Sequence, residues 1–149
     1  MLVVGENISV VSKVVGDAVK DRNAEPIIKM AKEQKDAGAD YIDVNIGPAT
    51  KKGEELMQWI VKSIQDKVNT PLALDTKNIS AIEAGLEVHK GTAMINSVTG
   101  DKDKLDILMP LSRPLLSSIR RYVLLRRLLS SGGEDWETLL SPTIVLGSS

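Results

Sequence analysis

The sequence contains no cysteine and a single histidine among its 149 residues. The absence of cysteine excludes disulfide bonds and thiolate metal ligands. The one histidine, His89, has no second soft ligand near it in the sequence with which to share a metal ion. We therefore predict no metal site and expect the His89 side chain to be solvated.

Long apolar runs are also missing. No run approaches the roughly 18 residues that a membrane-spanning helix needs, and the first residues, MLVVGEN, lack the basic start and apolar stretch of a signal peptide. The formal net charge of −1 gives no reason to expect nucleic-acid binding. Phenylalanine is absent, but 42% hydrophobic and 26% charged residues are typical of a globular domain. These features favour a cytoplasmic protein with one core and no membrane contact.

The composition changes near residue 111. All 13 lysines lie at or before position 104, whereas five of the six arginines lie at or after position 113. Residues 111–149 also hold ten leucines and eight serines. We therefore divide the chain into residues 1–111 and a divergent tail, residues 112–149.

Strand and helix patterns alternate along the first part. Short apolar runs ending in polar residues predict strands, and apolar residues at helical spacing predict the helices between them. Residues 8–23 suggest a loop with room for a short helix. The expected strands are 2–4, 41–45, 72–74 and 93–95, and the expected helices are 24–37, 53–67 and 101–109. One more helix is expected between the last two strands, starting after Asn78 and carrying Ile79, Ile82 and Leu86 at helical spacing. Repeated βα units predict an α/β fold with parallel strands, and four units are the first half of an eight-stranded (β/α)8 TIM-type barrel.

Polar side chains follow each expected strand. Because parallel strands place their carboxyl ends at one edge of a sheet, these side chains should meet there. Carboxylates accept hydrogen bonds and amides both donate and accept, a mixture that suits a flat nitrogen heterocycle. The phosphate-binding patterns GxGxxG and GxxxxGK[ST] are absent. The candidate binding residues are Glu6, Asn7, Asp43, Asn45, Asp75 and Asn96.

Each candidate also has a purely structural interpretation. Asp75 can cap the helix that follows it, and Asn96 can belong to an ordinary turn. Asp43 lies inside a strand pattern, where an inward carboxylate is costly unless it is paired or functional, so it favours function. Trp59 lies on a helical stripe and is expected in the core. The argument for a site depends on the convergence of these residues.

Five motifs in this order resemble the pterin-binding methyltransferases. They are GEN (5–7), DVNIGPA (43–49), LALDT (72–76), NISAIEAGL (78–86) and AMINS (93–97), and the resemblance covers residues 1–111. Within that family the sequence is most similar to methyltetrahydrofolate:corrinoid/iron–sulfur protein methyltransferases. The resemblance implies a barrel enzyme that acts as a homodimer.

The resemblance also implies an activity, which is transfer of the N5 methyl of methyltetrahydrofolate to Co(I) of a cobalamin held by a corrinoid partner protein. Asp75 and Asn96 would hydrogen-bond the pterin ring, and Asn96 would have the catalytic role. Asp43 and Asn45 would lie beside them in the pocket floor, with Glu6 and Asn7 on the first loop. No metal would be held by the barrel itself.

The sequence departs from the family pattern in two places. The family's first strand usually reads GERxN, whereas here Asn7 stands where Arg is expected and Ser9 where Asn is expected. The tail does not continue the barrel, and its change in composition is what a reading-frame shift produces. The alternative for the tail is a basic amphipathic helix over about 114–129.

Two other functions stay open at this level. A half-barrel exposes sheet edges that invite pairing with a second copy, so the chain can be a non-catalytic, self-associating fragment. A dihydropteroate-synthase-like enzyme is the other alternative. Sequence does not decide which folate derivative or corrinoid partner is used.

Overall fold

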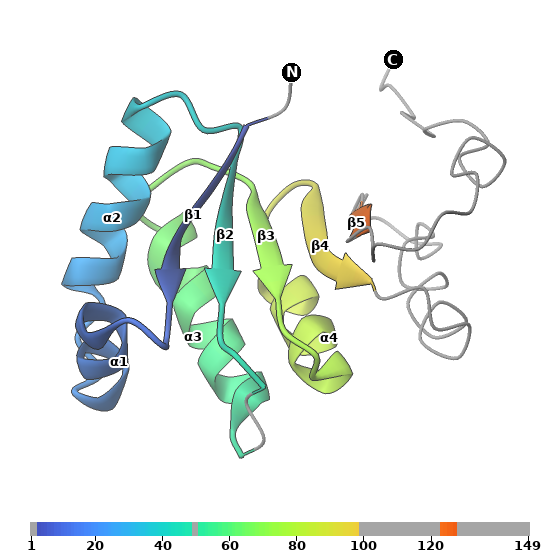
Figure 1. The fold of residues 1–149 in the computed structure, drawn as a ribbon, viewed down its shortest axis with the longest axis horizontal. Helices are drawn as coiled ribbons and strands as arrows, with labels where there is room; N and C mark the ends of the chain where they lie inside the picture. Colours follow the sequence, from blue (N-terminus) through green and yellow to red (C-terminus); the bar gives the residue numbers. More distant parts are fainter. Residues whose placement is uncertain (1–2, 49–50, 99–122, 128–149) are drawn as a thin grey trace, which may run out of the picture.

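A five-stranded parallel sheet, in the order β1-β2-β3-β4-β5, carries helices on one face (Figure 1). The computed structural model describes residues 3–48, 51–98 and 123–127. The elements are β1 (Val4–Ser9), α1 (Lys13–Lys20), α2 (Glu25–Asp36), β2 (Tyr41–Asn45), α3 (Gly53–Gln65), β3 (Leu72–Asp75), α4 (Ile79–Val88), β4 (Ala93–Val98) and β5 (Val123–Arg127). The predicted α/β class with parallel strands is confirmed, and the arrangement fits part of a (β/α)8 barrel.

Alternate residues of each strand divide between two faces of the sheet because successive side chains point to opposite sides. The set that packs with the helices forms the apolar core and is fully or almost fully buried. From β2 to β4 this set is Ile42, Val44, Leu72, Leu74, Ala93 and Ile95. The set on the opposite face is Asp43, Asn45, Ala73, Asp75, Met94 and Asn96. Every polar candidate on these three strands therefore lies on the face away from the helices.

The helix termini follow their sequence signals closely. Asn78 caps α4, because its side chain accepts a hydrogen bond from Ala81 N at 3.2 Å. Asp75 is therefore not the cap of that helix. Gly38 has φ +93° just after α2, as expected of a left-handed residue at a helix end. At the start of α2 the N-cap position is Ala24, and the expected cap, Asn23, lies one residue earlier and accepts a hydrogen bond from Glu25 N at 3.1 Å.

The prediction for the first strand is wrong in position. β1 runs from Val4 to Ser9, so Glu6 and Asn7 lie inside the strand instead of after it. Gly5 pairs with Ile42 and Ile8 pairs with Val44, which leaves two β1 residues opposite one β2 residue, as in a β-bulge. Ile8, only 1% exposed, continues the strand past the polar pair because it is buried in the core.

The first crossover contains two helices, α1 and α2, where the sequence suggested one helix after a loop with room for a short one. The α1 helix begins after Ser12, whose side chain accepts a hydrogen bond from Val15 N. Val15 and Ala18 bury one side of α1 against the core. This short amphipathic helix therefore has both a cap and an apolar anchor.

Few of the tail residues are described. The expected helix over 101–109 lies outside the described residues. Of the alternative helix over about 114–129, only residues 123–127 are described, and they form β5 rather than a helix. This segment, VLLRR, is extended because it pairs in parallel register with the edge of β4. Among the described parts of the chain, no helix is long and apolar enough to cross a membrane.

His89 is buried, so the expectation of a solvated side chain is wrong. The residue is 5% exposed and closes the carboxyl end of α4. Its ring atom Nε2 accepts a hydrogen bond from Leu72 N at 3.0 Å. The pairing of β3 with β4 begins at Ala73, one residue after Leu72. The imidazole therefore accepts the hydrogen bond from Leu72 N in place of a strand carbonyl.

Candidate functional site

Four polar residues form one row across the carboxyl ends of the strands. Ser9 of β1 pairs in register with Asn45 of β2, Asn45 with Asp75 of β3, and Asp75 with Asn96 of β4. In Figure 1 these ends lie at the arrowheads of the strands. The sequence-predicted residues Asn45, Asp75 and Asn96 are therefore brought together at one edge of the sheet.

Asn45 links two parts of this edge. Its amide atom Nδ2 donates to Asp75 Oδ2 at 2.6 Å, and its Oδ1 accepts from Gly47 N at 2.8 Å. Gly47 has φ +64°, a conformation that residues with a side chain rarely adopt. The turn after β2 is therefore folded back onto the side chain of the strand's own last residue.

Thr76 joins the same turn to the next one. Its hydroxyl donates to Gly47 O at 2.7 Å and accepts from Asn78 N at 3.1 Å. Since Asn78 in turn caps α4, the hydrogen bonds connect the end of β2 with the start of that helix. The loops after β2 and β3 are held as one unit.

Asp43 and Asn96 form a second carboxylate–amide pair, deeper in the sheet. Asn96 Nδ2 donates to Asp43 Oδ1 at 2.8 Å, and the two residues are 7% and 4% exposed. Ala73 lies in register beside Asp43 on the strand between them, and its small side chain leaves room for the contact. A buried carboxylate is thus paired, as its desolvation requires.

Glu6 and Asn7 lie apart from this row. Both are exposed, and they occupy the β1 bulge that stands opposite Asp43. They are nearer to the middle of the sheet than Ser9, which is the β1 residue in register with Asn45. The first-strand part of the expected pocket therefore consists of a bulge beside Asp43 rather than a polar strand end.

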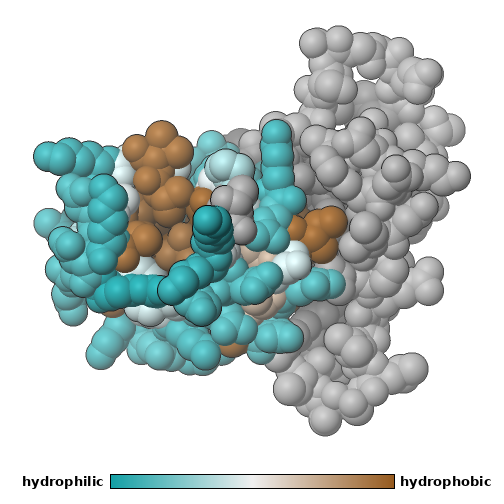
Figure 2. Space-filling model, turned by 90° about the horizontal axis from the view of Figure 1, so that it is seen from below, coloured by the Kyte–Doolittle hydropathy of each residue, from teal (hydrophilic) through white to brown (hydrophobic). Residues whose placement is uncertain are grey.

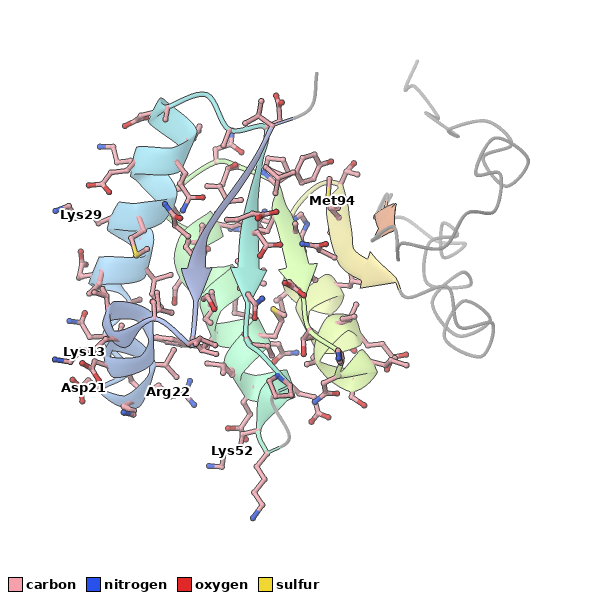
Figure 3. The ribbon with its side chains drawn as sticks, in the orientation of Figure 1. Lys13, Asp21, Arg22, Lys29, Lys52 and Met94 are labelled. Atoms are coloured by element: carbon pink, nitrogen blue, oxygen red, sulfur yellow. The ribbon has the colours of Figure 1, made fainter. Side chains whose placement is uncertain are left out.

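The surface at this edge is mainly hydrophilic, with a large hydrophobic group on the side of α1 and a smaller one on the other side (Figure 2). The exposed large hydrophobic residues beyond β1 are Val11 and Val14, at 84% and 56% exposure. Lys52, at the start of α3, extends away from the body of the molecule (Figure 3). The Arg22 guanidinium lies over the Trp59 ring, 5.2 Å from its centre. Trp59 was expected in the core, but it is half-buried and packs against the core from its margin.

The polar side chains of this edge are hydrogen-bonding groups. Its carboxylates accept and its amides both donate and accept, all on a rigid sheet. Within the described residues no group of three or more His, Cys, Asp or Glu side chains could hold a metal ion.

At the opposite end of β2, burial first and then the nearby Asp40 raise the pKa of Tyr41, which keeps its phenol protonated.

The carboxyl ends of the strands are where parallel α/β sheets usually bind their ligands, and the polar groups of this chain converge at that edge. Residues 11–113 match the family model described as pterin binding enzyme. The chain belongs to this family, and the family resemblance found in the sequence motifs is confirmed.

Two curated relatives illustrate the range of the family. The chain is 33% identical over 111 residues to a methylcorrinoid:tetrahydrofolate methyltransferase of Eubacterium limosum, covering 74% of this chain and 41% of that protein. It is 30% identical over 100 residues to a dihydropteroate synthase of Clostridium beijerinckii, covering 61% of this chain and 36% of that protein. The chain therefore spans about two fifths of the length of the relatives it matches.

Sequence reasoning missed the residues that hold the loops. Gly47 and Thr76 carry no chemistry that would mark them as part of a site, although both lie inside the motifs DVNIGPA and LALDT. The available signal was the spacing of Asn45 and Gly47, since an Asn followed two residues later by Gly is typical of a side chain that hydrogen-bonds a turn. Ser9, the β1 member of the register row, has no signal in the sequence apart from its departure from the family pattern.

Proposed function

We propose that this chain carries the first part of a pterin-binding methyltransferase that uses a folate substrate. The observation that carries the proposal is the convergence of Asn45, Asp75 and Asn96 in one register row at the strand carboxyl ends. Membership of the pterin-binding family and similarity to a methylcorrinoid:tetrahydrofolate methyltransferase support it. We further propose that four βα units of residues 1–111 make half of a (β/α)8 barrel, in a cytoplasmic protein.

In this proposal Asp75 and Asn96 hydrogen-bond the pterin ring. A carboxylate suits the N–H groups of the ring, and an amide suits an edge that carries both a donor and an acceptor. The pocket floor is completed by Asp43 and Asn45, and its margin by Glu6 and Asn7. Because these groups stand on strands rather than on loops, they are held rigidly enough to orient a flat ring.

The proposed reaction moves a methyl group between N5 of the folate and Co(I) of a corrinoid held by a partner protein. When methyltetrahydrofolate is the donor, the N5–carbon bond breaks, a cobalt–carbon bond forms, and N5 keeps the electron pair. N5 then needs a proton or a strong hydrogen bond. We assign this catalytic support to Asn96, whose amide is held in place by Asp43. The name of the E. limosum relative gives a methylcorrinoid as the methyl donor, which is the reverse direction.

The experiment that tests the proposal is calorimetric titration of the purified chain with methyltetrahydrofolate. The substitutions Asp75→Ala and Asn96→Ala should each weaken binding by roughly tenfold or more, since each removes a hydrogen bond to the ring. Lys29→Ala is the matched surface control, because Lys29 makes only an exposed ion pair with Glu33. Its affinity should equal that of the wild type.

The outcome separates three functions. Binding that both site variants lose supports the pterin site, and methyl transfer with a corrinoid protein then tests the activity. Binding of a pterin pyrophosphate in preference to methyltetrahydrofolate would favour the alternative of a dihydropteroate-synthase-like enzyme. A folded wild type that binds neither ligand would overturn the proposed function.

The non-catalytic alternative, a self-associating fragment, has one supporting observation. Among the described strands, β1 has a neighbour on one side only, so its other edge offers backbone hydrogen-bonding groups. The bulge at Glu6 and Asn7 works against this pairing by interrupting the edge. Light scattering over a range of concentrations shows whether the chain self-associates. A homo-oligomer formed by the β1 edge should dissociate on dilution, whereas a chain whose bulge prevents the pairing should be a monomer at every concentration.

A further inference from the structure

Both ends of the Asn45 side-chain amide are engaged within the protein. Nδ2 donates to Asp75 Oδ2 at 2.6 Å, and Oδ1 accepts from Gly47 N at 2.8 Å. These partners also fix which end is which. A flipped amide would set its oxygen against the carboxylate and its N–H against the N–H of Gly47. The side chain therefore has one orientation.

We infer that Asn45 is a positioning residue, which acts on the ligand through Asp75 rather than by touching the pterin ring. The inference rests on the proposed function, since it takes Asp75 as the group that binds the ring. Asp75 is the last residue of β3, and its side chain is half-buried. The hydrogen bond from Asn45 holds one carboxylate oxygen and thereby sets the direction of the other.

The backbone around Asn45 reinforces this role. Gly47 is anchored to Asn45 through its N–H and to Thr76 through its carbonyl. The backbone of Ile46 is tied to the same place, because its N–H donates to Asp75 O at 3.2 Å. Three hydrogen bonds therefore join residues 45–47 to residues 75–76: Asn45 Nδ2 to Asp75 Oδ2, Ile46 N to Asp75 O and the Thr76 hydroxyl to Gly47 O.

These bonds can be removed separately, and calorimetric titration with methyltetrahydrofolate then reports the affinity. Asn45→Asp keeps an acceptor for Gly47 N but sets two carboxylates against each other. Thr76→Val is the matched control, because it removes the bonds of the Thr76 hydroxyl to Gly47 O and Asn78 N and leaves the Asn45–Asp75 bond intact. Asn45→Ala removes both bonds of the amide. Urea denaturation of every variant gives its stability independently.

At pH 7.5 we expect Asn45→Ala and Asn45→Asp to bind methyltetrahydrofolate roughly 10- to 100-fold more weakly than the wild type. Between about pH 7 and pH 5 the paired carboxyls of Asn45→Asp take up a proton, which recreates a hydrogen bond to Asp75. Its affinity relative to the wild type should therefore recover toward acid pH, whereas that of Asn45→Ala should not. Thr76→Val should lower stability and keep its affinity within about threefold.

Wild-type affinity in Asn45→Asp at pH 7.5 would overturn the positioning role. An equal loss of affinity in Thr76→Val would overturn it as well, because loop rigidity alone would then explain the effect. A wild type that does not bind methyltetrahydrofolate would overturn the proposed function, and this role with it. Failure of the inference and failure of the function are thus distinguished by the wild-type titration.

Discussion

Asp43 and Asn96 are 53 positions apart in the sequence and on strands that are not neighbours, yet Asn96 Nδ2 lies 2.8 Å from Asp43 Oδ1. The two side chains meet across β3 beside Ala73. Both are buried, so the carboxylate has exchanged water for an amide donor. A change in the charge of either partner should therefore alter the stability of the fold, because water cannot reach the pair to screen the charge.

The first prediction concerns this pair. Asn96→Asp sets two carboxylates together, so the new pair holds a proton more tightly in the folded chain than in the unfolded one. We expect a loss of roughly 2–4 kcal/mol of unfolding free energy at pH 8. A raised folded-state pKa makes stability fall as pH rises, so the loss should be smaller at pH 5. Urea denaturation at the two pH values measures it.

The control for this pair is the double variant Asp43→Asn/Asn96→Asp, which restores one amide and one carboxylate in exchanged positions. Its stability should return most of the way to that of the wild type, and its pH dependence should disappear. Asp43→Asn measured alone completes the cycle. A double variant whose loss of stability equals the sum of the losses in Asp43→Asn and Asn96→Asp would show that the pair is not coupled.

Much of this site was accessible from the sequence, but its pairings were not. Strand ends that carry Asp75 and Asn96 are visible as apolar runs ending in polar residues, and parallel topology brings them to one edge. The partners of these residues depend on strand register, which no local pattern records. That is why the sequence could predict that Asp43 and Asn45 lie near Asp75 and Asn96 without predicting that Asn45 pairs with Asp75 and Asp43 with Asn96.

The failures have similar causes. Glu6 and Asn7 read as the end of a strand because they are polar, yet the buried Ile8 carries β1 past them as a bulge. His89 read as solvated because a lone histidine carries no partner in the sequence. Its partner is a backbone N–H of Leu72, 17 residues away, which only the packing of α4 beside β3 reveals.

The second prediction concerns the packing of α4 on α3. A Cβ at Gly85 would lie 2.6 Å from Met57 Cγ and 3.0 Å from Leu74 Cδ1. Gly85→Ala gains about 1 kcal/mol of helix propensity but must displace two buried side chains, which typically costs about 1–3 kcal/mol. Overpacking should win, with a net loss of stability in thermal or urea unfolding. Ser80→Ala, at an exposed position of the same helix, should change stability little.

The third prediction concerns the pKa of Asp66, which lies near the amino-terminal end of β3. The hydrogen bond and charge of Lys90, 2.8 Å away, hold the pKa of Asp66 below its ordinary value of 3.8. Lys90→Met should let it rise toward that value, as an NMR titration of the carboxyl carbon will show. Lys67→Met is the control, because Lys67 makes a smaller contribution and should change the titration less.

The sign of this pair's effect on stability follows from the lowered pKa. A carboxyl with a depressed folded-state pKa contributes stability above its ordinary pKa and loses it as pH falls through the folded value. The stability that this ion pair contributes is therefore lost below pH 3.8. Since both side chains are well exposed, Lys90→Met should leave stability near neutral pH almost unchanged. A large loss at pH 7 would contradict this description of the pair.

The last prediction concerns His89, whose Nε2 accepts from Leu72 N at 3.0 Å while Nδ1 faces Gly91 O at 3.3 Å. An acceptor at Nε2 requires the neutral ring with its hydrogen on Nδ1, which then donates to Gly91 O. His89→Leu fills a similar space but leaves the buried N–H of Leu72 without this acceptor. We expect a loss of about 1–3 kcal/mol in urea denaturation.

A second variant separates the hydrogen bond from packing. His89→Gln keeps an oxygen near the end of the side chain and should retain more stability than His89→Leu, even though leucine is the more hydrophobic residue. If His89→Leu were the more stable of the two, burial of apolar surface would outweigh the bond to Leu72. The imidazole would then be a filler of the core rather than the acceptor that completes the start of β3.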